Sequence, residues 1–310
     1  MPKISVLMTT LNSEKYISEA IESILHQTFE NFELVIVDGG SSDNTINIIN
    51  KFDDKRIRLF VVEGLRRSAQ LNYGVEKSVG EFIAIMDSDD IALPERLKLQ
   101  SEFLQANENI NIVGTWAYLV SEDGEYNSLF KRPTRNNIII SQLLAMNGIC
   151  FGTICFKRDL AEKNKFNEKL NISEDIEWFL RLSAFNSFAN LPIPLMKLRQ
   201  VKKSRSRYYP VKNQQLLESM EEYLIKKLNE ANDFYNRVGT LRDLGLINYY
   251  YGSLKKARKY LLSSFFLFPV SFLTIRYLVP ILIFPEGIFE KVRNIKLFRK
   301  LAAIFRKIFV

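Results

Sequence analysis

The sequence predicts an α/β protein in which helices cover both faces of a mostly parallel sheet, followed by a helical C-terminal region. Short apolar runs alternate with amphipathic stretches as far as about residue 120. The runs have the length of strands, and the stretches between them show the three- and four-residue spacing of helices. From about residue 210 onward the pattern becomes helical. Regular alternation of strand and helix is typical of a parallel sheet covered on both faces.

Five apolar runs are interpreted as strands. They are Lys3–Thr10, Phe32–Val37, Ile57–Val62, Phe82–Met86 and Ile110–Val120. Two helices are predicted between them, one from the spacing of the apolar residues from Ile17 to Leu25 and one over Thr45–Phe52. In sheets of this kind, ligands bind at the carboxyl ends of the strands.

Length and composition allow a large core and a second unit. The chain has 310 residues, of which 47% are hydrophobic, which is sufficient for one packed domain and a smaller one. We expect the α/β domain over residues 1–210 and a helical region with an amphipathic, basic tail over residues 211–310. The first ten residues are interpreted as a strand and not as a signal peptide, which predicts a cytoplasmic protein. Cys150 and Cys155 lack the spacing of a zinc site or a disulfide framework and are expected to be packing residues.

Much of the excess positive charge behind the net charge of +8 lies in two segments, Lys197–Lys212 and residues 291–310. Residues 291–310 carry basic residues and no acidic one, and Phe298, Leu301 and Phe305 share a helical face. This pattern predicts a helix lying on an anionic membrane surface, hence peripheral attachment to the inner face of the cell membrane. A helix that packs on the domain is the alternative. No zinc-finger spacing is present, and acidic strand ends would repel phosphates without a metal, so no nucleic-acid partner is expected.

Two acidic strand ends are expected to share one edge of the sheet. Asp87, Asp89 and Asp90 follow the strand Phe82–Met86, and Asp38 ends the strand before a turn rich in glycine and capping residues. Carboxylates this close together repel one another unless solvent or a hard cation lies among them. The pattern favours a metal site, with an acidic turn as the alternative.

Several motifs, in order, resemble the family 2 glycosyltransferases. They are Ser5–Asn12, Gln27–Phe29, Val37–Thr45, Leu71–Gly74, Gly80–Ile83 and Met86–Leu97. The run Asp-Asp-Ile-Ala-Leu-Pro-Glu-Arg at residues 89–96 is most similar to the branch that builds bacterial exopolysaccharide, capsule and lipopolysaccharide. The resemblance implies the GT-A fold, which is Rossmann-like, over residues 1–210.

The resemblance also implies roles for particular residues. A nucleotide-diphospho-sugar would lie across the strand ends, with Mg²⁺ or Mn²⁺ held against its diphosphate. Asp89 would bind the metal directly, and Asp87 would contact the ribose or bind the metal through water, with Asp90 as a helper or helix-leading residue. Thr9 and Asp38 would line the nucleoside pocket. Arg67 would reach a phosphate, unless it is an exposed arginine at a helix start.

The donor and the acceptor are less defined. Family members commonly carry two consecutive aspartates where this chain has Asp38-Gly39. In the family one of these aspartates can accept a hydrogen bond from the base, so its loss weakens the case for uracil. UDP is the first expectation for the donor nucleotide, and dTDP and GDP stay open. The acceptor is expected to be a hydroxyl of a glycan or a lipid-linked molecule. The basic cluster Lys197–Lys212 would close over the diphosphate or touch lipid head groups, or it is a solvated loop.

A catalytic base is predicted at the start of a helix. The segment Ser173–Leu182 resembles the family's Glu-Asp segment, which implies Asp175 as the base and Glu174 as the second choice. Acids that merely stabilise a helix start are the alternative. One base without a covalent nucleophile implies a single displacement with inversion at the anomeric carbon. A catalytically inactive, membrane-associated module that binds sugar nucleotides remains the competing interpretation of the whole chain.

Overall fold

The computed structural model describes residues 1–143, 146–170, 172–183, 185–201, 214–231, 233–268, 274, 277–278 and 281–282. The chain divides into two compact units, Met1–Tyr209 and Pro210–Val310.

The first unit is built on one sheet. Its strands are β1 (Ile4–Thr10), β2 (Phe32–Asp38), β3 (Ile57–Val61), β4 (Phe82–Asp87), β5 (Ile91–Ala92), β6 (Ile112–Val120), β7 (Tyr126–Phe130), β8 (Cys155–Lys157) and β9 (Phe188–Arg199). The strand order is β3-β2-β1-β4-β8-β6-β9-β5, and β7 pairs with β6. The pairs among β3, β2, β1 and β4 are parallel, as is the pair β6 and β9. Strand β8 runs antiparallel to both of its neighbours.

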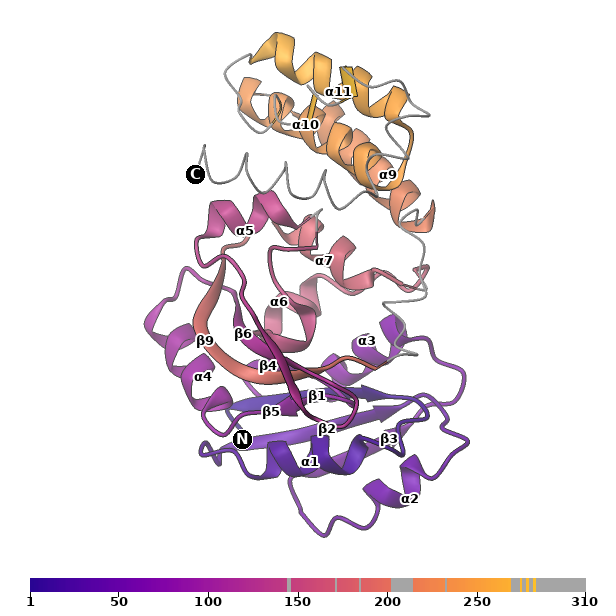
Figure 1. Cartoon of the computed structure of the whole chain (residues 1–310), viewed down its shortest axis with the longest axis vertical. Coiled ribbons are helices and arrows are strands. Elements are labelled where there is room, and N and C mark those ends of the chain that lie inside the picture. The colour runs from indigo at the N-terminus through magenta and orange to yellow at the C-terminus, as the bar shows by residue number, and fades with distance from the viewer. Residues whose placement is uncertain are drawn as a thin grey trace. The chain divides into compact units, whose positions relative to one another are not determined.

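Helices cover both faces of this sheet. They are α1 (Ile17–Leu25), α2 (Thr45–Ile49), α3 (Arg67–Lys77), α4 (Arg96–Ala106), α5 (Asn136–Gln142), the short 3-10 helix η1 (Phe151–Thr153), α6 (Arg158–Lys163) and α7 (Glu174–Leu182). In Figure 1, α1 and α2 lie below β1 and β2, and α6 and α7 lie above them. The predicted α/β architecture, a mostly parallel sheet with helices on both faces, is confirmed.

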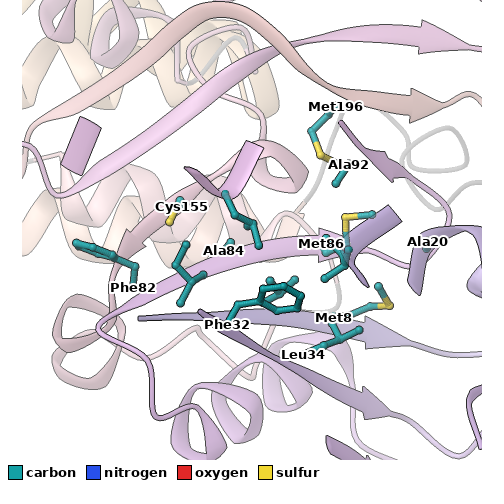
Figure 2. Packing of buried hydrophobic residues seen from close by; sticks show 14 of the residues in the cluster. Met8, Ala20, Phe32, Leu34, Phe82, Ala84, Met86, Ala92, Cys155 and Met196 are labelled. Carbon is teal, nitrogen blue, oxygen red and sulfur yellow. The ribbon is translucent and has the colours of Figure 1, made fainter. Parts of the chain in front are cut away.

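Alternation along the central strands separates two apolar clusters. In β1, Val6 and Met8 point to the cluster that includes α1, whereas Leu7 points to the cluster that includes α3 and α7. This two-sided burial explains why the central strands read as continuous apolar runs. Figure 2 shows part of the first cluster, in which Met8 and Met86 lie on neighbouring strands.

The five predicted strands are confirmed with small shifts at their ends, but four strands were not predicted. Strands β5 and β8 are two and three residues long, too short to show a period. Strand β9 contains Pro192 and Pro194, residues that argue against a strand because each lacks an N–H donor. The pairing of β9 with β6 shifts register between Thr115 and Ala117, which accommodates these prolines.

The second unit is helical, as expected. It contains α9 (Gln214–Glu230), α10 (Phe234–Tyr251) and α11 (Leu254–Leu267). Gly245 of α10 permits a close approach, because a Cβ there would lie 2.5 Å from Cγ of Leu261 in α11. None of the helices within the described residues is sufficiently long and apolar to cross a membrane. The predicted basic tail, residues 291–310, lies outside the described residues.

Candidate active site

The two acidic strand ends share one edge of the sheet, as predicted. In the parallel register, Thr9 of β1 pairs with Asp87 of β4, and Thr10 pairs with Asp38 of β2. Successive side chains of a strand point to opposite faces. Asp87 therefore continues the face of Ile85 in the cluster of α3 and α7, whereas Asp38 continues the face of Ile36.

Arg67 links this edge to helix α7. The residue begins α3, and its Nη2 donates to Oδ1 of Asp87 at 2.6 Å while its Nη1 donates to Oε1 of Glu174 at 3.1 Å. The guanidinium also lies 5.3 Å from the centre of the Phe151 ring. The alternative of an exposed arginine is therefore wrong. The Arg67 guanidinium bridges the carboxylates of Asp87 and Glu174. It therefore brings the predicted donor-binding and base segments into one site.

Asp175 lies in α7 beside this ion pair. Burial raises the pKa of Asp175 to about 6, the charge of Glu174 adds to this rise, and Arg67 opposes it. Its Oδ1 accepts the N–H of Ile176 at 2.9 Å. The other two acids of the first turn are ion-paired, Glu174 with Arg67 and Glu177 with Arg181. Within the described part of the chain, Asp175 makes no ion pair, so it is the acid of this turn with a carboxylate available for proton transfer.

The acidic loop, defined as Asp87–Asp90, turns tightly at the end of β4. The N–H of Asp90 donates to the carbonyl of Asp87 at 3.3 Å. Burial, together with the charge of Asp87, raises the pKa of Asp89 to about 6. Burial and the charges of Asp89 and Asp87 raise the pKa of Asp90 well above its usual range. Asp90 does not lead a helix, because β5 follows it and α4 begins only at Arg96. Its Oδ1 instead accepts the N–H of Arg199 at 2.8 Å.

The carboxylate of Asp38 is hydrogen-bonded within its own loop. Its Oδ1 accepts the N–H groups of Gly40 at 2.9 Å and Ser41 at 2.7 Å, and its Oδ2 accepts the Ser41 hydroxyl at 2.6 Å. Gly40 has φ +94°, a left-handed conformation that favours glycine. The side chain of Asp38 is fully buried. The predicted contact of Asp38 with a nucleoside, like that of Thr9, stays a prediction.

The structure explains why Gly39, and not a second aspartate, follows Asp38. A Cβ at Gly39 would lie 2.3 Å from Nε2 of Gln70, far inside van der Waals contact. Gln70 is buried in α3, and its Nε2 donates to the carbonyl of Leu65 at 2.7 Å. Any side chain at position 39 would displace this amide.

The segment Cys150–Thr153 also touches the acidic loop. A Cβ at Gly152 would lie 2.7 Å from Oδ2 of Asp87 and 3.4 Å from Oδ2 of Asp90. Sequence reasoning assigned no site residue to this segment. The ring of Phe151 on Arg67 and the close approach of Gly152 make η1 a wall of the site.

The residues of the acidic loop suit a metal that is shared with a diphosphate. Among the described residues, no group of three or more His, Cys, Asp or Glu side chains is arranged to hold a metal ion. Asp89 makes no side-chain hydrogen bond or ion pair with any residue that the structure describes, whereas Asp87 is paired with Arg67. Mg²⁺ typically takes one or two carboxylates together with substrate phosphates. Asp89, with Asp87 beside it, fits such a site.

Comparison with other sequences establishes the family. The family model "Glycosyl transferase family 2" matches residues 5–164. An "Uncharacterized glycosyltransferase" of Haemophilus influenzae is 27% identical over 320 residues, which cover 96% of each chain. The "O-antigen biosynthesis glycosyltransferase WbnJ" of Escherichia coli is 35% identical over 189 residues, 58% of this chain and 71% of WbnJ. The chain belongs to the family 2 glycosyltransferases and is an enzyme of that class.

Solved structures confirm the predicted GT-A fold. Residues 1–349 of TarS from S. aureus, in complex with UDP-GlcNAc, superpose with a TM-score of 0.66 at 20% identity and 90% coverage of each chain. The mannosyltransferase PcManGT from Pyrobaculum calidifontis, in complex with GDP-Man and Mn²⁺, gives a TM-score of 0.57 at 17% identity. That match covers 85% of this chain and 75% of the mannosyltransferase.

Proposed function

We propose that this enzyme transfers a sugar from a nucleotide-diphospho-sugar to a hydroxyl of a glycan or lipid-linked acceptor during synthesis of a cell-surface polysaccharide. The reaction is metal-dependent and inverts the anomeric carbon. The observation that carries the proposal is the Arg67 bridge, because it joins Asp87 at the donor edge to the Glu174–Asp175 turn. The similarity to an O-antigen glycosyltransferase supports the class of product.

The donor is proposed to lie across the carboxyl ends of β1, β2 and β4. UDP is the first candidate nucleotide, since the TarS structure holds UDP-GlcNAc. dTDP and GDP stay open, since PcManGT holds GDP-Man. Thr9 and the loop shaped by Asp38 form the nucleoside side of the site. Bound Mg²⁺ or Mn²⁺, held by Asp89 with Asp87, would stabilise the charge that develops on the leaving diphosphate.

Asp175 is proposed as the general base. It would accept the proton of the acceptor hydroxyl as that oxygen attacks the anomeric carbon, on the face opposite the leaving diphosphate. A pKa of about 6 leaves the carboxylate ionised at neutral pH and close to the range where a base works best. Glu174 is proposed to hold Arg67, not to take the proton. With Asp175 acting as a base and not as a covalent nucleophile, transfer occurs in one displacement.

A nucleotide-release assay tests this function. UDP-, dTDP- and GDP-sugars are incubated with the enzyme and a mixture of glycan and lipid-linked acceptors, with Mn²⁺ or Mg²⁺ and with chelator. We expect release from one nucleotide class, dependent on the metal. Binding of nucleotide without release from any donor would instead support the inactive sugar-nucleotide-binding module.

The pH dependence should move when the charge beside Asp175 is removed. At saturating Mn²⁺, which displaces protons from Asp89, we expect kcat/KM to fall as the pH drops through about 6, where Asp175 becomes protonated. The variant Glu174→Gln removes a charge that raises this pKa, so the fall should occur at lower pH. Glu177→Gln, paired with Arg181 on the same helix, should leave the profile unchanged. An unshifted profile in Glu174→Gln would contradict the assignment of Asp175.

The basic tail is proposed to attach the enzyme to the inner face of the cell membrane. The proposal rests on the sequence of residues 291–310 alone. Deleting these residues should move the protein from the membrane fraction to the soluble fraction, because the apolar face and the positive charges are lost together. Replacing only the basic residues of the tail by glutamine should have a smaller effect in the same direction. Unchanged fractionation of the deletion variant would refute membrane attachment through the tail.

A further inference from the structure

Arg199 is buried in the structure, although in the sequence it belongs to a basic cluster. In the sequence it belongs to the basic cluster Lys197–Lys212, for which contact with diphosphate or lipid was predicted. In the structure it is the last residue of β9, and its side chain is only 4% exposed. Its guanidinium is therefore turned into the protein and does not belong to a solvent-facing patch.

Two hydrogen bonds join Arg199 to the acidic loop. Its backbone N–H donates to Oδ1 of Asp90 at 2.8 Å, and its Nε donates to the carbonyl of Asp89 at 2.9 Å. The antiparallel pairing of β5 with β9 brings these groups together, because Ile91 lies opposite Lys197. Arg199 thus binds the last two residues of the acidic loop, Asp89 and Asp90.

The remaining donors of Arg199 fasten that loop to two other elements. Nη1 donates to the carbonyl of Glu122, in the turn between β6 and β7, at 2.6 Å. Nη2 is ion-paired with Glu19 of α1. The guanidinium also lies 5.0 Å from the centre of the Tyr16 ring. One planar group therefore connects three segments that are distant in the sequence.

We propose that Arg199 is a positioning residue of the transferase. Its side chain fixes the backbone of Asp89, next to the carboxylate of Asp90 that its backbone N–H holds, so that the Asp89 side chain stays directed away from protein partners. This inference rests on the proposed function, in which Asp89 binds the metal of the metal–diphosphate complex. The carboxylates of the loop repel one another. Arg67 pairs with Asp87. Arg199 supplies a second fixed cation beside Asp89 and Asp90, without which this end of the loop would relax to separate its charges. A fixed Asp89 lowers the cost of ordering the site when the nucleotide binds.

The chemistry requires arginine at this position. The three N–H directions used here, from Nε, Nη1 and Nη2, come from one rigid plane. A lysine keeps the charge but has a single ammonium centre, so it cannot reach the three partners together. The variant Arg199→Lys therefore separates geometry from charge.

The matched control is Arg56→Lys. Arg56 also pairs with a carboxylate, Asp54, and its guanidinium also lies on an aromatic ring, that of Phe32. Its side chain is 27% exposed. It precedes β3, next to the amino end of β2, since its carbonyl accepts the N–H of Leu34. Lysine there removes a comparable guanidinium from the edge of the sheet opposite to the acidic loop.

The first measurement needs no ligand. Hydrogen exchange of the backbone amides of residues 88–92 is compared in the wild type, Arg199→Lys and Arg56→Lys. We expect at least a tenfold faster exchange at Asp90 and Ile91 in Arg199→Lys alone. Equal exchange in all three proteins would overturn the inference.

The second measurement uses the nucleoside diphosphate that binds best among UDP, dTDP and GDP. By calorimetry, Arg199→Lys should weaken binding about tenfold in the presence of Mn²⁺, as expected for a residue that orients a metal ligand, and leave binding in chelator within twofold. An equal loss with and without Mn²⁺ would show a general structural role and would overturn the inference. If nucleotide and Mn²⁺ bind as predicted but no donor releases its nucleotide, the proposed function fails while the role of Arg199 stands.

A third measurement covers the case in which the lysine variant is unstable. Activity of Arg199→Ala should rise with millimolar guanidinium chloride and not with ammonium chloride, because only guanidinium can reproduce the planar set of donors. Rescue by both cations, or by neither, would contradict the need for this geometry.

Discussion

Replacing Asp175 by asparagine is expected to lower kcat by about 10²- to 10⁴-fold, the usual contribution of a positioned general base. The amide has nearly the shape of the carboxylate but cannot take the acceptor proton. The affinity for the nucleotide should change little, because Asp175 is proposed to act on the acceptor side. Steady-state kinetics of nucleotide release, together with nucleotide binding by calorimetry, check this split between kcat and affinity.

Glu177→Gln is the matched control for Asp175→Asn. Glu177 lies in the same helical turn, is as buried as Glu174, and is paired with Arg181 at 3.0 Å. It should keep kcat within a few-fold of the wild type. If Asp175→Asn kept kcat within threefold while Glu174→Gln lost it, the base would be Glu174 and the role given to the Arg67 bridge would be wrong.

Replacing Asp89 by alanine is expected to remove metal-dependent activity, with a fall in kcat/KM of at least about 10²-fold. Loss of a residue that merely supports a metal ligand already costs 10- to 100-fold. Activity in chelator should be the same in the variant and in the wild type. Asp53→Ala, at an exposed position before β3, is the control and should behave as the wild type.

The stability of Asp89→Ala distinguishes a lost ligand from a damaged fold. The pKa of Asp89 is raised to about 6, so its ionised form is less favourable in the folded than in the unfolded chain. The folded protein therefore loses stability from this group as the pH rises through the range from its ordinary pKa to about 6. At neutral pH without metal, Asp89→Ala should melt at the same temperature as the wild type or higher. A clearly lower Tm would show that Asp89 supports the fold.

The strands that carry the site could be predicted from local patterns. Because β1, β2 and β4 are buried on both faces, each is a continuous apolar run, and each run ends where a polar residue reaches the edge. That regularity alone predicts that Asp38 and Asp87 lie on one edge of the sheet. The helix that starts at Glu174 has an amphipathic pattern of its own, with buried Ile176 and Phe179.

The contacts that assemble the site depend on long-range pairing, which no local pattern encodes. In the sequence, Arg199 is indistinguishable from its basic neighbours. Its burial follows from the pairing of β9 with β5 and β6, which the local sequence does not show. Arg67 is recognisable in the sequence only as an arginine at a helix start. Its ion pair with Glu174 could not be predicted, because the two residues are distant in the sequence. The close approaches at Gly39 and Gly152 involve Gln70 and Asp87. A glycine by itself does not show which neighbour requires it.

The central claim is that one carboxylate, Asp175, activates the acceptor for a single displacement. The anomeric configuration of the first product tests it most directly. With an α-linked nucleotide sugar, proton NMR of the product at early times should show a β-glycosidic linkage, which Asp175→Asn should form far more slowly. An α-glycosidic product would mean retention of configuration and would contradict the single displacement proposed for this site.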